Sequence, residues 1–351
     1  MTRILTVVVP GDIQTRTGGY EYDRRMIDAL RHRGWTVAVR ELDAGFPHPS
    51  EPARQQAGAV LRAEQDDALV LIDGLALGAL PEEAEAEGAR LRIVALVHHP
   101  LALETGLDTD SAARLFESER RALGAARLVI VTSGATARRV EGYGVSADRV
   151  RVVSPGTEAA DLGHGSGGKS VHLLSVGSLV PRKGYALLLQ ALASMRDLPW
   201  QLTLAGSRER SPATAAALVV QARELGLESR VAFTGELSER ALAAQYAAAD
   251  VFVLPTLYEG YGMVVAEAVA RGLPVVATDT GGIADMLGGD AGIVCPPGDG
   301  QALSMALRRV IGDPSARAAL AAGARRVRAR LPSWADQAAL METALLEAPA
   351  R

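Results

Sequence analysis

Two acidic and two basic residues in the second half of this 351-residue chain have the types and spacing to bind a charged, hydroxyl-rich ligand. Glu259 and Glu267 would lie about 12 Å apart if all the steps between them were helical. That distance is comparable with the span from a hexose to a ribose across a diphosphate. The adjacent Arg182 and Lys183 supply a planar guanidinium fork and a compact ammonium, which both suit phosphate oxygens. The four side chains therefore predict a site for a diphosphate flanked by two sugar rings.

The two glutamates lie in one strand–turn–helix–strand segment. Val251–Leu254 is a short apolar run that Pro255 ends, and it is typical of a buried strand. A turn, Glu259–Gly262, precedes the helical stretch Met263–Arg271, and Val275–Ala277 is the next strand. The turn is therefore expected at the carboxyl edge of a parallel sheet, where open α/β folds bind ligands.

Backbone amides in this turn add to the predicted site. The amides of Gly260, Tyr261 and Gly262 precede a helix, and a helix N-terminus suits anionic or hydroxyl-rich ligands. The alternative is an N-capping acid followed by a solvated helix carboxylate, which would be favoured for any isolated glutamate. Here that alternative must also explain two glycines around Tyr261 and a basic turn upstream, so we prefer the binding interpretation.

The basic turn, Gly177–Gly184, contains Arg182 and Lys183. It follows the strand-like run Val171–Val176 and precedes the helical stretch Ala186–Met195, so it too is expected at a carboxyl edge of the sheet. Taken alone, a basic pair beside Pro and Gly is more often an exposed loop. The turn gains weight because it opens the same half of the chain as the paired glutamates.

The first half of the chain offers weaker candidates. Gly18 and Gly19 open a predicted helix, where a glycine pair lets the backbone approach a phosphate or sugar closely, although an ordinary turn is the alternative. The GxGxxG fingerprint of nicotinamide-binding proteins is absent. His98 and His99 end a strand without the spacing of a metal site, and a lone His is more often a satisfied polar residue.

Two acids complete the candidates of the first half. Asp73 follows another strand, and Glu104 lies in a predicted loop, so both are candidate ligands of an acceptor molecule, as is His99. A solvated loop residue is the favoured alternative for each.

Strands and helices alternate along the chain, which predicts parallel sheets with helices on both faces. In the first half the predicted strands are Arg3–Val9, Thr36–Leu42, Ala68–Asp73, Arg92–His98, Arg127–Ser133 and Arg149–Gly156. The predicted helices between them are Tyr20–Arg33, Ala53–Glu64, Pro81–Ala89, Ala112–Gly124 and Ala135–Tyr143. The Gly-rich stretch 161–169 is predicted to link two domains, 1–160 and 170–333. The tail Leu331–Ala348 is a predicted amphipathic helix.

Composition excludes several classes of protein. Hydrophobic content of 48% and charged content of 22% are ordinary for a soluble globular protein, and the net charge of −4 argues against a nucleic-acid partner. No apolar run approaches the ~18–20 residues of a membrane span. Cys295 is the only cysteine, which excludes an intrachain disulfide and a thiolate metal cage. We expect a cytoplasmic protein, and the Ala- and Arg-rich composition resembles that of bacterial proteins.

Five segments of the second half, in this order, resemble the retaining glycosyltransferases of family 4, which have the GT-B fold of two facing Rossmann-like domains with an interdomain cleft. They are Gly177–Gly184, Leu204–Ser207, Arg230–Leu237, Tyr246–Gly282 and Gly292–Asp299. Each motif is weak by itself, but five in order over about 120 residues are specific. Glu259 and Glu267 match the family's pair of glutamates, and the first half of the chain resembles the family more loosely.

The resemblance implies a role for each candidate residue. Arg182 and Lys183 would stabilise the leaving diphosphate, Glu259 would hold the donor-sugar hydroxyls, and Glu267 would bind the ribose. The family's sugar-contacting histidine matches His98 best, although the register also allows His99. The remaining residues implied in donor binding are Gly18, Gly19, Gly177, Gly206, Ser207, Phe233, Thr234, Gly235, Leu237, Gly260, Tyr261, Gly262 and Met263.

The resemblance also implies the domain roles and the reaction. Domain 1–160 would bind the acceptor, with helix 334–348 packing back onto it, and domain 170–333 would bind a nucleotide-diphosphate sugar. The expected enzyme is a retaining glycosyltransferase that needs no metal or other cofactor, because the basic pair stabilises the leaving group. Closure of the two domains would exclude water. The acceptor would be a small molecule or glycan. We expect no nucleic-acid partner and find no strong membrane signal, and the oligomeric state stays open.

Three other functions are alternatives. A nucleotide-sugar epimerase on the same fold would need acid and base carboxylates beside the sugar. A cofactor-dependent phosphorylase would need a Schiff-base lysine, and the chain has only Lys169 and Lys183. A non-catalytic protein that binds nucleotide sugars is the third possibility, which the complete set of motifs disfavours.

Overall fold

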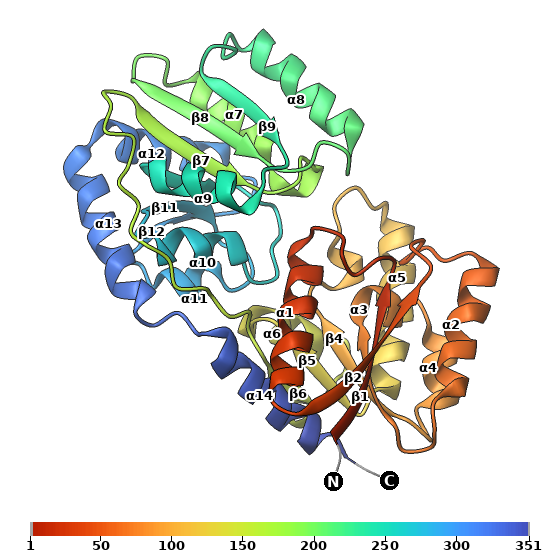
Figure 1. The fold of residues 1–351 in the computed structure, drawn as a ribbon. Coiled ribbons are helices and arrows are strands. Elements are labelled where there is room, and N and C mark those ends of the chain that lie inside the picture. The colour runs from red at the N-terminus through yellow and green to blue at the C-terminus, as the bar shows by residue number, and fades with distance from the viewer. Residues whose placement is uncertain (1–2, 350–351) are drawn as a thin grey trace. The chain divides into compact units, whose positions relative to one another are not determined.

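The computed structural model describes residues 3–349 and contains two compact units. Unit 1 comprises the chain up to Gly156 together with the chain from Pro332 onward, and unit 2 comprises Thr157–Leu331. Each unit has its own six-stranded, all-parallel sheet with helices on both faces (Figure 1). The predicted α/β class with two parallel sheets is confirmed.

The sheet of unit 1 has the strand order β2-β1-β3-β4-β5-β6. Its strands are β1 (Arg3–Pro10), β2 (Trp35–Leu42), β3 (Leu69–Asp73), β4 (Arg92–Val97), β5 (Leu128–Val131) and β6 (Val150–Val152). Inner strands such as β3 and β5 are buried along their whole length, as expected where helices cover both faces of a parallel sheet. The direction of winding reverses between β1 and β3, so the loops after these strands form a topological switch point, where such sheets bind ligands.

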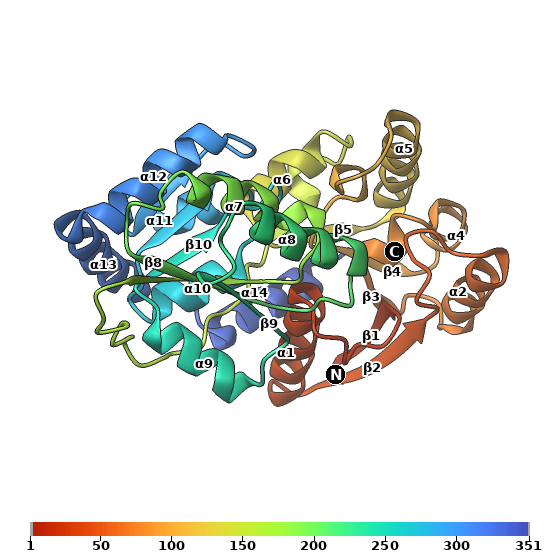
Figure 2. The ribbon, with the colours of Figure 1, turned by 90° about the horizontal axis from the view of Figure 1, so that it is seen from above.

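Helices cover both faces of this sheet. They are α1 (Gly18–His32), α2 (Glu51–Ala63), α3 (Gly74–Leu77), α4 (Pro81–Glu87), η1 (Leu101–Leu103), α5 (Thr109–Ala125), α6 (Gly134–Glu141), η2 (Ala147–Arg149) and α14 (Trp334–Glu347). Figure 2 shows α1 on one side of strands β1 to β3, and α2 and α4 on the other. On the second side, Ala57, Leu61, Leu77 and Leu123 join one apolar core with the strands.

Helix α14 belongs to unit 1 although it is the last element of the chain. The ring of Trp334 meets that of Tyr22 on α1 edge-on, with centroids 6.0 Å apart. The Glu342 carboxylate accepts hydrogen bonds from Arg33 Nε at 2.8 Å and from the Trp35 indole at 3.1 Å. These contacts join α14 to the first helix and to the start of the second strand of unit 1, and Figure 1 shows α14 beside α1.

The sheet of unit 2 has the strand order β12-β11-β10-β7-β8-β9. Its strands are β7 (Val171–Val176), β8 (Trp200–Ala205), β9 (Val231–Gly235), β10 (Val251–Leu254), β11 (Val275–Thr278) and β12 (Gly292–Cys295). Counted within the unit, this is the doubly wound order 6-5-4-1-2-3. The switch point therefore lies between β7 and β10, the two strands that lead into the basic and the acidic turns.

The helices of unit 2 form two layers. They are η3 (Pro181–Lys183), α7 (Tyr185–Ala193), α8 (Pro212–Glu224), α9 (Glu239–Ala248), α10 (Met263–Ala270), α11 (Ile283–Leu287), α12 (Gly300–Gly312) and α13 (Pro314–Arg328). Helices α7, α8 and α12 share one apolar core with the sheet, and α9, α10, α11 and α13 share the core of the other face. No helix in the described part of the chain combines the length and apolar character that crossing a bilayer requires.

Most element boundaries differ from the sequence predictions by one to four residues, and β6 and α14 are among the larger differences. The predicted strand Arg149–Gly156 pairs with β5 only over Val150–Val152. The predicted tail helix Leu331–Ala348 begins later, at Trp334, because the Ser333 side chain caps its N-terminus. The predicted linker, 161–169, carries no helix or strand and lies within unit 2.

Candidate functional site

The basic and acidic turns of unit 2 meet at the switch point between β7 and β10. Lys183 Nζ lies 2.7 Å from Glu259 Oε2, a direct ion pair between the two turns. Arg182 Nη1 lies 4.0 Å from the same carboxylate and donates a hydrogen bond to the carbonyl of Tyr258 at 3.0 Å. The Lys183 and Glu259 side chains are 12% and 18% exposed, so solvent screens the pair only in part. The structure thus brings the predicted cations and one predicted acid together.

Backbone contacts fix the two turns against each other. The carbonyl of Arg182 accepts hydrogen bonds from the Leu257 amide at 2.8 Å and from the Thr256 hydroxyl at 3.0 Å. Gly184 has a left-handed backbone, with φ +68°, and a Cβ there would lie 2.0 Å from the carbonyl oxygen of Pro255. Only glycine tolerates both the left-handed conformation and this close approach.

Glu267, the second predicted acid, lies on α10 and has its own hydrogen-bond donor. The Tyr246 hydroxyl donates to Glu267 Oε2 at 2.9 Å, and the Arg271 guanidinium lies 4.6 Å from the centre of the Tyr246 ring. Burial, and then the charge of Glu267, raises the pKa of Tyr246 well above its usual value, so the hydroxyl keeps its proton. The sequence prediction did not include Tyr246 or Arg271. Tyr246 lies 21 positions before Glu267, and nothing local in the sequence signals that its hydroxyl reaches this carboxylate.

The acidic turn is built from glycines as predicted. Gly262 has φ +93° at the N-cap of α10, and a Cβ there would lie 2.9 Å from Ile283. Gly260 is buried, and α10 begins at Met263, two residues after Tyr261. Burial raises the pKa of Tyr261 to about 12. The turn therefore presents its amides at a helix N-terminus, as the sequence predicts.

The other predicted donor-binding residues of unit 2 lie at the same carboxyl edge. The Gly206 amide donates to the carbonyl of Gly235 at 3.0 Å, and a Cβ on Gly206 would lie 2.0 Å from the carbonyl oxygen of Gly177. The carbonyl of Ser207 accepts a hydrogen bond from the Leu179 amide at 2.8 Å. The remaining predicted residues lie in or just after the edge strand β9, and they are Phe233, Thr234, Gly235 and Leu237.

In unit 1 the glycine pair lies against a histidine. Gly18 and Gly19 are the first residues of α1, where the Thr17 side chain caps the helix by accepting a hydrogen bond from the Tyr20 amide. A Cβ on Gly19 would lie 3.4 Å from the His98 ring. The pair therefore allows α1 to approach the carboxyl end of β4 closely.

His98 belongs to a buried cluster with two acids. Its Nε2 lies 2.9 Å from Asp23 Oδ1 on α1 and 3.7 Å from Asp73 Oδ2 at the end of β3. Burial opposes a charge on His98, but the carboxylates, chiefly that of Asp23, outweigh it and raise the pKa of the imidazole. Sequence reasoning missed Asp23, because an acid in a polar helix has no pattern that separates it from a solvated residue.

His99 and Glu104 form a second, looser pair. Their side chains approach to 3.7 Å between His99 Nε2 and Glu104 Oε2. The intervening chain contains η1, whose first amide, that of Leu101, donates to Glu119 Oε2 at 2.9 Å. The structure therefore places the two acceptor candidates on one short segment that Glu119 anchors to α5.

Glu119 is a buried acid whose ionisation should weaken unit 1. Burial raises its pKa to about 7, so the folded state binds a proton that the unfolded state has released above about pH 4.5. Stability therefore falls as the pH rises from about 4.5 to about 7. Glu119→Gln keeps an acceptor for the Leu101 amide without the charge, and should raise the free energy of unfolding at pH 8 by about 2 kcal/mol.

Urea unfolding at pH 5 and pH 8, followed by tryptophan fluorescence, checks this expectation. The gain should be small at pH 5, where the folded wild type already carries the proton. Glu117→Gln is the matched control, because Glu117 lies on the same helix, is exposed and has a pKa lowered mainly by its hydrogen bond to Arg120. Equal effects of the two substitutions at pH 8 would disprove the role of burial.

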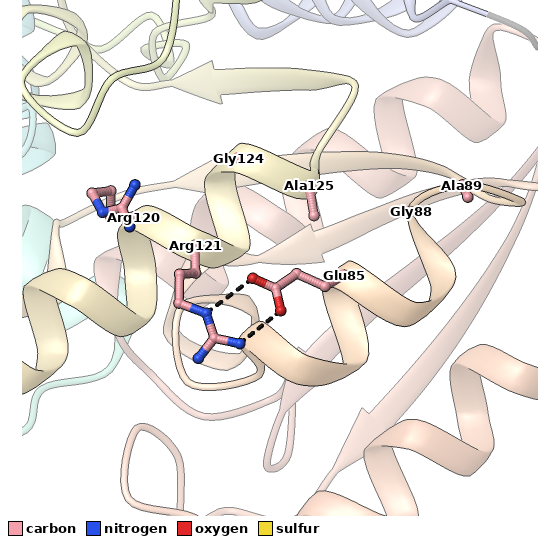
Figure 3. Close-up of a pocket in the computed structure, with 7 residues that line it drawn as sticks. All are labelled: Glu85, Gly88, Ala89, Arg120, Arg121, Gly124 and Ala125. Carbon is pink, nitrogen blue, oxygen red and sulfur yellow. Dashed lines mark hydrogen bonds and ion pairs between the residues drawn. The ribbon is translucent and has the colours of Figure 1, made fainter.

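A further hollow of about 460 Å³ lies between α4 and α5 (Figure 3). Its charged lining is already paired, because Arg121 contacts Glu85 through two hydrogen bonds of 2.9 and 2.6 Å, and Arg120 contacts Glu117. The C-terminal ends of both helices lead into the starts of β4 and β5, so the hollow is at the amino edge of the sheet. It does not belong to the candidate site.

Two family models match the chain. Residues 159–327 match the model described as Glycosyl transferases group 1, and residues 61–161 match the model described as Glycosyltransferase Family 4. The MMP alpha-(1->4)-mannosyltransferase of Mycolicibacterium hassiacum is 28% identical over 313 residues, which cover 84% of this chain and 74% of that protein. The D-inositol 3-phosphate glycosyltransferase of Thermomonospora curvata is 33% identical over 257 residues, covering 66% of this chain but only 59% of its own length.

Solved structures share the fold over nearly the whole chain. The sucrose-phosphate synthase of Thermosynechococcus elongatus superposes with a TM-score of 0.81 at 24% identity, covering 97% of this chain and 98% of that one. Anabaena HepE, solved in complex with UDP and glucose, superposes with a TM-score of 0.76 at 21% identity, covering 97% and 99%. The family matches extend from residue 61 to residue 327, and with this architecture they assign the chain to the family 4 glycosyltransferases of the GT-B fold.

Proposed function

We propose that the protein is a retaining, metal-independent glycosyltransferase that moves a sugar from a nucleotide-diphosphate sugar to an acceptor hydroxyl. The observation that carries the proposal is the ion pair between Lys183 and Glu259 at the switch point of unit 2. A cation there suits a diphosphate, and an adjacent carboxylate suits sugar hydroxyls. The complex of the similar HepE with UDP and glucose supports a donor of this class.

The basic pair would stabilise the leaving group. Breaking the anomeric C–O bond develops positive charge on the sugar and negative charge on the diphosphate. The Lys183 ammonium has three N–H donors, of which Glu259 takes one, so two remain for phosphate oxygens. Arg182, on the same turn, adds a second fixed cation. Cations held in place before the reaction need no reorganisation as the charge develops, which is the role that a metal ion has in other transferases.

The carboxylates would orient the two ends of the donor. Glu259, with the amides of Gly260–Gly262, would hold the donor-sugar hydroxyls, and Glu267 would accept hydrogen bonds from the ribose. The family resemblance supports attack by the acceptor on the face that the diphosphate leaves, which retains the anomeric configuration. Proton NMR of the product would give that configuration directly.

A donor screen followed by product analysis tests the proposal. Thermal stabilisation by UDP-, GDP-, ADP- and dTDP-sugars identifies the donor, and transfer is then assayed with and without acceptors, and with EDTA. We expect acceptor-dependent transfer that EDTA does not abolish. An epimerised donor formed without acceptor would replace the proposal with the epimerase alternative, and binding without turnover would favour a non-catalytic protein.

Glu267→Ala should weaken nucleotide binding about 30-fold, the effect of losing a charge-assisted hydrogen bond of about 2 kcal/mol. Tyr246→Phe should have a smaller effect, because it removes only the hydroxyl that orients the carboxylate. Calorimetric titration with the nucleoside diphosphate measures both changes. Glu224→Ala, an exposed acid at the end of α8, is the control and should bind like the wild type. Unchanged affinity in Glu267→Ala would remove the ribose role.

A further inference from the structure

The cluster of Asp23, Asp73 and His98 concentrates more negative charge than a buried site normally accepts. The Asp23 and Asp73 side chains are only 1% and 7% exposed, and His98 is 19% exposed. The groups whose charges act on His98 are these two carboxylates. The neighbouring titratable side chain, Tyr22, keeps its ring edge-on to the imidazole and donates its hydroxyl to the carbonyl of Val153 at 3.0 Å. Burial of two ionised carboxylates beside one imidazole would leave a net negative charge at low dielectric.

The hydrogen bonds of the cluster leave one acceptor to be explained. Asp23 Oδ1 is bonded to His98 Nε2, and Asp73 Oδ1 accepts the Leu75 amide at 2.7 Å as the N-cap of α3. Asp23 Oδ2 is buried, and among residues 3–349 it has no hydrogen-bond partner if both carboxyl groups are ionised. The two carboxyl groups are close enough to hydrogen-bond each other. A proton on Asp73 would supply the donor that Asp23 Oδ2 lacks.

We propose that Asp73 keeps a proton that it donates to Asp23, and that Asp23 in turn holds His98 as an imidazolium with Nε2–H inward and Nδ1–H available to a substrate oxygen. Asp23 and Asp73 are then positioning residues that act through His98. The arrangement balances: an imidazolium, one carboxylate and one neutral acid carry no net charge. This inference rests on the proposed function and extends it, because it makes the predicted sugar-contacting histidine a hydrogen-bond donor whose state depends on pH.

The direction of the pKa shifts agrees with this arrangement. Burial, and then the charge of Asp23, raises the pKa of Asp73 to about 7. Asp23 offsets the effect of burial on His98 and raises the pKa of the imidazole. As the pH rises through about 7, Asp73 loses the shared proton and the two carboxylates repel each other. Activity that depends on the orientation of His98 should therefore change in a step near pH 7.

A metal ion is the competing explanation for the same three side chains. Each offers one ligand-type atom within 4.8 Å of the others. The distance of 2.9 Å from His98 Nε2 to Asp23 Oδ1 is that of a hydrogen bond, so the nitrogen is directed at the carboxylate. The proton therefore explains the geometry without moving a side chain.

Two asparagine variants separate the roles of the acids. In Asp73→Asn the amide nitrogen can donate to Asp23 while the amide oxygen caps α3, so the variant imitates the protonated acid at every pH. We expect it to keep His98 in the same ring form and to remove the step in kcat/KM near pH 7. Asp23→Asn removes the negative charge beside Nε2, so it should lower the pKa of His98 and lower kcat/KM about tenfold. Asp28→Asn, an exposed acid on the same helix, is the control and should change neither quantity.

Nitrogen and proton NMR of histidine-labelled protein measures the ring form and titration of His98, whose signals are identified by their loss in His98→Gln. This readout needs no substrate, so it tests the cluster even if the proposed transferase reaction fails. Retention of the imidazolium in Asp73→Asn, with loss in Asp23→Asn, would support the proposal. Equal changes in the two variants would overturn it. So would a shift of the His98 signals on adding Zn²⁺, Mn²⁺ or Mg²⁺, or on adding EDTA.

Discussion

Lys183→Ala is expected to lower kcat/KM for sugar transfer about a hundredfold. The ammonium is the cation that directly contacts Glu259, and removing it takes about 3 kcal/mol of stabilisation from the departing diphosphate. It also leaves the mostly buried Glu259 carboxylate with the Arg182 guanidinium, whose Nη1 lies 4.0 Å from Glu259 Oε2. We therefore expect a loss in kcat that exceeds the loss in donor affinity, because the charge on the leaving group is greatest in the transition state.

The chain supplies a natural control for this experiment. Lys169 is the only other lysine, it lies in the exposed stretch before β7, and Lys169→Ala should transfer sugar at the wild-type rate. Lys183→Arg should recover part of the activity, since it restores the charge but not the compact geometry. Steady-state kinetics with the identified donor measure all three variants. Wild-type turnover in Lys183→Ala would rule out the leaving-group role.

Gly184→Ala is expected to destabilise unit 2 by more than 3 kcal/mol and to separate the basic turn from the acidic one. The left-handed backbone costs an alanine about 1 kcal/mol. The larger part comes from the Cβ, which would lie 2.0 Å from the carbonyl oxygen of Pro255 and must displace backbone on one side or the other. Because Leu257 and Arg182 are joined across the same interface, the displacement should also disturb the Lys183–Glu259 pair.

Gly289→Ala isolates the effect of the close approach. Gly289 has a similar backbone, with φ +77°, but nothing lies within 4 Å of the position of its Cβ. Gly289→Ala should therefore lower the free energy of unfolding only by the cost of an alanine in a left-handed backbone, about 1 kcal/mol. Thermal unfolding monitored by Trp200, the one tryptophan of unit 2, compares the variants. Equal losses in the two variants would show that the contact between the turns contributes nothing.

The fold class was predictable because each strand and helix of a parallel α/β sheet has a residue pattern that a short stretch of sequence shows. Short apolar runs that a turn residue ends, such as Val251–Leu254 before Pro255, favour strands covered on both faces, and the helical stretches between them indicate crossover connections. The binding residues at the strand ends were also predictable, because glycines next to charged residues at these positions have few purely structural explanations. The basic and acidic turns could therefore be named from the sequence.

Their contact could not be named, because it depends on strand order. Lys183 and Glu259 are separated by 76 positions and meet only because β7 and β10 are neighbours in the sheet. Asp23 is hidden for the same reason, since it is 75 positions from His98 and lies in a helix rich in charged residues. The burial of Glu119 could not be predicted either. The segment at Leu101 covers this single position of α5, and one covered position does not change the hydrophobic periodicity of the helix.

The two-part composition of unit 1 has a consequence for how the protein matures during synthesis. Ribosomes release the chain from its amino end, so Glu342 emerges only after every strand of unit 2 has been made. Until then Trp35 and Arg33 lack their carboxylate partner, and the face of α1 that packs on Trp334 stays uncovered. Unit 2 is continuous in the chain and has no such wait. We expect the later-synthesised unit to reach its native state first, with the earlier one completed by the final helix.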